Sequence, residues 1–142
     1  MANAAFNRYK SGIQVADYDL LVASIKASLV RGYTFNAAHA TVADVTGAGG
    51  TLNGTTAALA NPTMTDGVFD ADDTSLSATA SAVNHGLLLY QASAVGGGAD
   101  VPTNQQLLIA YYDTGTGLPI QPGTGTVNIA WSAGAAKILA VT

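Results

Sequence analysis

Two histidines are the first candidates for metal binding or acid–base chemistry, and they lie in different segments of the chain. A zinc site would need His39 and His85 to converge with carboxylates, because zinc takes four ligands in a fixed geometry. His39 lies in a polar segment, whereas His85 leads into the apolar run 87–90. The sequence therefore favours one surface histidine and one partly buried structural histidine over a metal site.

Four of the nine aspartates form the one acidic cluster of the sequence: Asp66, Asp70, Asp72 and Asp73. Several carboxylates on one loop could bind a hard cation such as calcium. The cluster lacks the glycine and the late glutamate of an EF-hand loop, and the chain contains no glutamate at all. Because aspartate is common in turns, the pattern favours a solvated turn that ends one strand and begins the next.

Other catalytic patterns are missing from the sequence. The chain has no cysteine and no Gly-x-Ser-x-Gly motif, and nothing nominates a Ser–His–Asp triad. The glycine-rich segment 47–51 lacks the lysine of a phosphate-binding P-loop. We therefore predict a protein that is not an enzyme and that needs no cofactor.

Charge is unusually scarce in this chain. Charged residues make up 10% of the 142 residues, against about 25% in soluble domains. The net charge of −4 argues against nucleic acid as a partner, since phosphate binding needs clustered cations. Charge is also depleted at the cores of protein interfaces, so this composition favours a surface that is buried between subunits. The alternative is a weakly charged surface of extracellular type.

The elements that would carry these residues are mostly strands. Short alternating or apolar runs recur, with turn signals every 8–12 residues, which is typical of an antiparallel β-sandwich or jelly roll. The run 86–91 is predicted to be buried on both faces, and 106–113 to be a second core strand. Segment 62–69 is predicted as one strand, 93–104 as a mobile loop and 114–125 as a long loop. The expected strands lie at 25–31, 51–60, 62–69, 74–80, 86–91, 106–113, 126–132 and 137–141.

The N-terminal segment 1–13 is predicted to be a short helix or an arm, followed by one β domain over 14–142. Phe6, Tyr9 and Ile13 recur at helical spacing, and the cations Arg8 and Lys10 lie among them. Such a segment could pack on its own domain or on a neighbouring protein. If the segment tethers the protein to its partner, deletion of residues 1–12 should weaken that binding and leave the β domain folded. The segment has no apolar signal core, and no stretch is long enough to span a bilayer, so we expect a cytoplasmic product that does not bind membranes.

Four sets of residues resemble a family of small virion structural proteins of tailed bacteriophages. The first two are the start Met-Ala-Asn-Ala-Ala-Phe-Asn and the segment Ile-Lys-Ala-Ser-Leu-Val at 25–30. The third is Thr-Asp-Gly-Val-Phe-Asp-Ala-Asp-Asp at 65–73. The fourth combines Ala-Tyr-Tyr-Asp at 110–113, Thr-Gly-Leu-Pro-Ile at 116–120, Ile-Ala-Trp at 129–131 and Ala-Lys-Ile at 136–138.

The resemblance implies a capsid cement or decoration protein on the outside of the virion. Its partner would be the major capsid protein, and the protein itself would be a homo-oligomer, either a dimer or a trimer. A tail-associated structural or glycan-binding adhesion protein is the alternative. The contact segments expected from the sequence are the arm 1–13 and the loops 93–104 and 114–125. The candidate contact residues are Phe6, Arg8, Tyr9, Lys10, Tyr112, Leu118 and Pro119.

Overall fold

A five-stranded antiparallel sheet forms the centre of the protein. The structure is a computed structural model that describes residues 3–135 and 137–140. The strand order is β1-β10-β7-β2-β3, and every neighbouring pair is antiparallel. Its strands are β1 (Ala4–Ala5), β2 (Ile25–Arg31), β3 (Thr51–Thr55), β7 (His85–Gln91) and β10 (Leu107–Tyr112). The prediction of a mostly β, antiparallel fold is confirmed.

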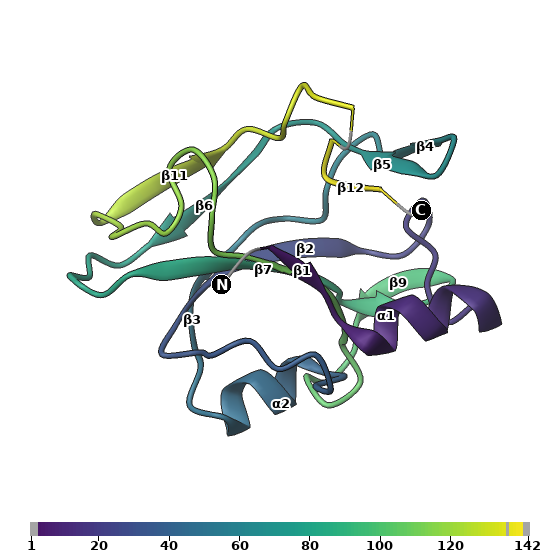
Figure 1. Ribbon diagram of the computed structural model, residues 1–142, viewed down its shortest axis with the longest axis horizontal. Helices are drawn as coiled ribbons and strands as arrows, with labels where there is room; N and C mark the ends of the chain where they lie inside the picture. Colours follow the sequence, from purple (N-terminus) through teal and green to yellow (C-terminus); the bar gives the residue numbers. More distant parts are fainter. Residues whose placement is uncertain (1–2, 136, 141–142) are drawn as a thin grey trace.

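A second layer covers one face of this sheet (Figure 1). It consists of the pair β11–β6 and the three-stranded sheet β12-β5-β4, an arrangement consistent with a β-sandwich. The hydrophobic core between the layers includes Leu29, Leu89 and Ile109 from the central sheet and Phe69 and Leu76 from the second layer. The strands of the second layer are β4 (Thr63–Thr65), β5 (Val68–Asp70), β6 (Thr74–Ala78), β11 (Gly125–Ile129) and β12 (Leu139–Ala140).

The opposite face of the central sheet is covered by short helices and the segment between β2 and α2 (Figure 1). The helices are α1 (Asn7–Gly12), its 3-10 extension η1 (Ile13–Val15) and α2 (Val42–Gly47). Thr41 and Asp44 form a capping box at the start of α2, which satisfies backbone N–H groups of the first turn. Because both faces of the sheet are covered, β7 is buried along its whole length, as its continuous apolar run predicts.

The N-terminal segment packs against the rest of the domain and is not a separate arm, and the short helix predicted within it is α1. β1 pairs with β10, and the Phe6 backbone N–H donates to the Ile109 carbonyl at 3.0 Å. Phe6 is fully buried, and its ring lies 4.8 Å from that of Phe35. Tyr9 is also buried, with its ring edge-on to Tyr18. Of the two alternatives for this segment, packing on its own domain is the one found. The prediction of Phe6 and Tyr9 as contact residues is corrected, because their apolar area is buried within the domain.

Two further segments differ from the sequence prediction. Segment 62–69 is a hairpin of β4 and β5, because Asp66 and Gly67 take positive φ angles of 51° and 79°, as two-residue hairpin turns require. Segment 93–104 is not a loop throughout, since β8 (Ser93–Ala94) and β9 (Gly97–Asp100) form a second hairpin. The Lys26 amine pairs with the Asp100 carboxylate at 2.5 Å and ties this hairpin to β2.

Candidate functional site

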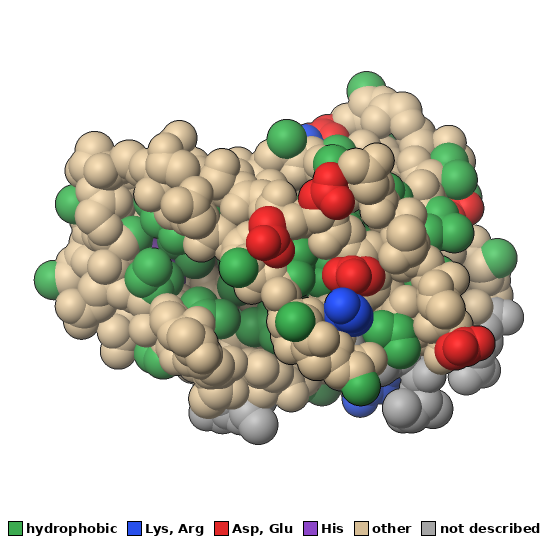
Figure 2. Space-filling view, turned by 90° about the horizontal axis from the view of Figure 1, so that it is seen from above, with side chains coloured by type: hydrophobic (Ala, Val, Ile, Leu, Met, Phe, Trp, Pro, Cys, Tyr) green, Lys and Arg blue, Asp and Glu red, His purple; other side chains and the backbone are tan. Residues whose placement is uncertain are grey.

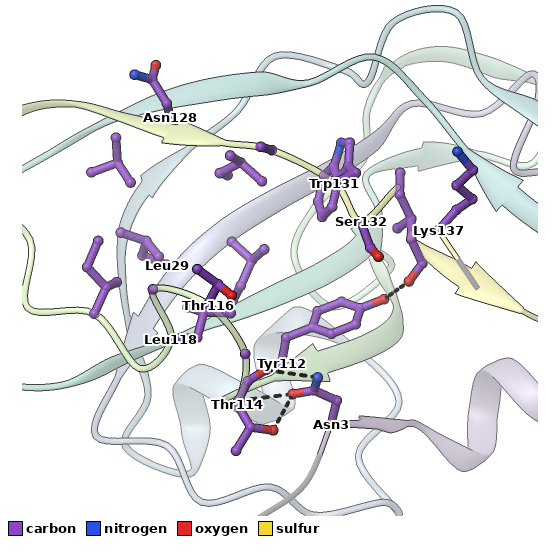
Figure 3. Close-up of a pocket in the computed structure, with 18 residues that line it drawn as sticks. Asn3, Leu29, Tyr112, Thr114, Thr116, Leu118, Asn128, Trp131, Ser132 and Lys137 are labelled. Carbon is purple, nitrogen blue, oxygen red and sulfur yellow. Dashed lines mark hydrogen bonds between the residues drawn. The ribbon is translucent and has the colours of Figure 1, made fainter. Parts of the chain in front are cut away.

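A cavity of about 510 Å³ opens between the two layers and is the leading candidate for a functional site. One wall is β11 with the residues that follow it, and the other is the loop after β10 (Figure 3). Its apolar lining comes from segments far apart in the sequence. The apolar lining residues are Leu29, Leu87, Leu118, Ile120, Val127, Ile129, Ala130 and Ile138.

Aromatic residues lie at one end of this cavity. Tyr112 reaches across from β10, and its hydroxyl donates to the Ile138 carbonyl at 2.6 Å (Figure 3). Trp131 follows β11, and its indole N–H donates to the Asp72 carbonyl at 3.1 Å. The Asp73 carboxylate accepts the Trp131 backbone N–H at 2.9 Å. The two aromatic side chains are therefore held in place by bonds within the protein.

The polar rim of the cavity is also largely satisfied internally. The Asn3 side-chain oxygen accepts the backbone N–H groups of Asp113 and Thr114, while its amide donates to the Thr114 carbonyl. Among the lining residues that the structure describes, Lys137 carries the charge, and its amine lies 3.7 Å from the Asp70 carboxylate. A lining of this kind is suited to shape recognition of an apolar group.

The predicted contact residues fall into three groups, of which the first, Phe6 and Tyr9, is buried in the domain. Tyr112 and Leu118 line the cavity, and the exposed Pro119 adjoins Leu118. Arg8 forms an ion pair with Asp17, whereas Lys10 is exposed in the last turn of α1. The sequence reasoning missed Trp131 as a lining residue, because strand alternation alone placed it in the core.

Both histidines form hydrogen bonds with groups of the protein itself. His85 is fully buried, with Nδ1 at 2.7 Å from the Val83 carbonyl and Nε2 at 3.2 Å from the Asn53 amide. These partners suit the tautomer that carries its hydrogen on Nδ1. His39 hydrogen-bonds the Tyr33 hydroxyl at 2.9 Å. Within residues 3–135 and 137–140, no three His, Cys, Asp or Glu side chains gather as a possible metal site.

The four aspartates of the acidic cluster have different roles and partners in the structure. Asp66 forms part of the β4–β5 turn, and Asp70 faces Lys137. The Asp72 carboxylate accepts a hydrogen bond from the Asn61 amide at 2.7 Å, and Asp73 holds Trp131. The predicted turn interpretation agrees with the placement of Asp66, and the other three join segments of the second layer to one another.

An apolar tip lies apart from the cavity. We define it by Leu21, Val22 and Val95, whose exposed fractions are 49%, 58% and 42%. The turn of the β8–β9 hairpin lies against the Val22 backbone, where a Cβ on Gly97 would come within 2.9 Å of the carbonyl oxygen. Exposed apolar side chains that are grouped in this way are common at protein contacts.

Buried tyrosines make the fold sensitive to alkaline pH. Burial raises the pKa of Tyr9 to about 12, and it also raises the pKa values of Tyr18 and Tyr112 above their ordinary 10.0. Above pH 10.0 the unfolded chain loses phenolic protons that the folded protein keeps. The stability from these groups is therefore complete below pH 10.0 and is lost as the pH rises through the folded pKa values.

We expect tyrosinate absorbance and circular dichroism to change together when the protein is titrated with alkali. The neutral phenols of Tyr9, Tyr18 and Tyr112 resist ionisation until the fold opens. Full ionisation of all six tyrosines near pH 10.0, with the circular dichroism spectrum unchanged, would contradict this expectation.

Comparisons with known protein families, with curated proteins and with solved structures found no match to this chain. No helix within residues 3–135 and 137–140 is long and apolar enough to cross a membrane.

Proposed function

We propose that this protein is a virion structural protein of a tailed bacteriophage, a capsid cement or decoration protein. It binds the outer surface of the major capsid lattice and stabilises it, as a homo-oligomer. The observation that carries the proposal is the convergence of the segments that resemble the phage family. Segments 110–113, 116–120, 129–131 and 136–138 each contribute residues to the cavity lining, among them Tyr112, Leu118, Trp131 and Lys137.

The surface chemistry supports this proposal. The face in Figure 2 is mostly uncharged, with a few acidic and basic side chains among polar and apolar ones. Neutral surface loses less hydration energy on burial than charged surface, so it suits the contacts of a lattice. The apolar tip adds three exposed aliphatic side chains that a capsid contact would remove from water. Each fully buried Val or Leu contributes about 1.5–3 kcal/mol.

Quantitative gel analysis of purified particles tests the proposal. A cement protein is expected at a copy number comparable with that of the major capsid protein. Particles that lack it should release their DNA at lower temperature than complete particles. Only a few copies per particle would overturn the cement role and support the tail alternative.

The alternative, a tail-associated or glycan-binding protein, has one supporting observation. Tyr112 and Trp131 are aromatic, and the cavity rim carries the hydroxyls of Thr114, Thr116 and Ser132. Sugars are often held by aromatic rings and polar side chains. However, the Tyr112 hydroxyl and the Trp131 indole N–H already have partners within the protein, which favours an apolar occupant.

A further inference from the structure

We propose that the cavity between the layers binds an extended, apolar segment of a partner protein, which adds as a strand along the free edge of β11. The segment carries alternating apolar residues and one basic residue at the end that lies near Trp131. The cavity and the strand edge define this site. Only the origin of the segment, the major capsid protein, rests on the proposed function.

The first argument is an unpaired strand edge in the second layer. This layer is divided into the pair β11–β6 and the sheet β12-β5-β4, so β11 is paired with β6 alone within the described chain. Residues 127–131 border the cavity, and the apolar side chains of Leu118 and Ile120 face the same space (Figure 3). A strand edge offers unpaired backbone N–H and C=O groups, to which an extended peptide can add.

The second argument is the chemistry of the space beside that edge. Its volume of about 510 Å³ falls within the range of roughly 300–1,000 Å³ found for ligand pockets. The polar atoms of Asn3, Tyr112 and Trp131 already make hydrogen bonds within the protein. A polar ligand would find its partners at the rim, in side chains such as Thr116 and Ser132, whereas aliphatic side chains would bury apolar surface inside the cavity.

The third argument is charge complementarity at the Trp131 end. Asp72 and Asp73 both hydrogen-bond Trp131, through a backbone carbonyl and a carboxylate respectively, and Asp70 lies beside Lys137. The carboxylates of Asp73 and Asp70 therefore lie near this end with the single Lys137 ammonium, whereas the Asp72 carboxylate bonds the Asn61 amide. Both side chains of the Lys137–Asp70 pair are more than a third exposed, and its N···O distance is 3.7 Å, so this contact is weak. A lysine or arginine on the incoming segment complements this excess negative charge.

Single cysteines provide the test, because the chain has no cysteine of its own. Thr116→Cys places a thiol on an exposed loop residue of the cavity wall. Thr126→Cys places one on an exposed β11 residue that does not line the cavity, and Val22→Cys places one on the apolar tip. Each variant is incorporated into particles, and the rate of maleimide labelling is compared with that of the free protein.

We expect the thiol at position 116 to react several-fold more slowly in the particle, whereas the thiol at 126 keeps its rate. A thiol-anchored photocrosslinker at 116 should then join one stretch of the partner, with alternating apolar residues and a nearby lysine or arginine. An unchanged rate at 116, or a cross-link to a second copy of this chain, overturns the inference. Protection at position 22 without protection at 116 rejects the strand site but keeps the cement role. Absence of the protein from particles rejects the cement role itself.

The cross-linked stretch then provides a test in solution. A synthetic peptide of that sequence is titrated into the wild-type protein, and the emission of Trp131 is followed. Trp131 is the single tryptophan of the chain and lines the cavity, so its emission reports on this site. A shift to shorter wavelength with the peptide, and none with a scrambled peptide, supports the inference. Identical responses to both peptides contradict it.

Discussion

Replacing Phe6 with alanine is expected to lower the free energy of unfolding by about 3–5 kcal/mol. Phe6 is fully buried in a cluster with Val42, Val45, Leu88 and Leu108, so its removal leaves a cavity that the sheet cannot close. Whole domains are stable by only about 5–15 kcal/mol, so this one change removes a large share of the total. Urea unfolding followed by circular dichroism measures the loss.

Lys10→Ala is the matched control for this prediction. Lys10 lies in helix α1, which begins directly after Phe6 in the chain, but is exposed, so its replacement should change the free energy of unfolding by no more than about 0.5 kcal/mol. If Phe6→Ala were as mild as Lys10→Ala, the segment would be a detachable arm and its placement in the core would be wrong. By the same reasoning, deletion of residues 1–12 should unfold the domain, because it removes both Phe6 and Tyr9 from the core.

Gly54→Ala is expected to cost about 2–5 kcal/mol through two separate effects. Gly54 has a φ of +87°, which side chains rarely adopt. A Cβ at this position would also lie 2.2 Å from the Ser77 carbonyl oxygen and 2.9 Å from a methyl group of Leu76. Because β3 and β6 belong to different layers, the clash would push the layers apart at this point. Thermal unfolding measures the effect.

Gly98→Ala separates the two effects. Gly98 has a similar φ of +97°, but nothing lies within 4 Å of its missing Cβ. Its replacement should therefore show the cost of backbone strain alone, about 1–2 kcal/mol. Equal losses for the two variants would mean that the close approach of β3 to β6 contributes nothing to stability.

The local sequence predicts most of the strands correctly. The run 86–91 is apolar at nearly every position, which predicts burial on both faces, and β7 is buried throughout. In 126–132 the alternation predicts that Val127, Ile129 and Trp131 point to the same side, and all three are half-buried against the core. These predictions succeed because each depends on the spacing of side chains within one strand.

The errors have a shared physical cause. Aspartate and glycine at 66–67 reverse the chain, which divides one predicted strand into β4 and β5. Glycines 96–98 looked like a loop, yet the positive φ angles of Gly97 and Gly98 allow the β8–β9 hairpin. In both segments the outcome depends on pairing with residues across a turn, which periodicity within a strand does not report.

The sequence by itself determined the class of fold and the scarcity of charge, because these depend on composition and on local order, whereas its resemblance to phage virion proteins stays a prediction. Only the tertiary structure decided which residues share a site. Tyr112, Leu118, Trp131 and Lys137 come together because β10 and β11 lie in different layers and the connecting segments fold back between them. The structure also placed Phe6 in the core, because the pairing of β1 with β10 directs its side chain under the sheet.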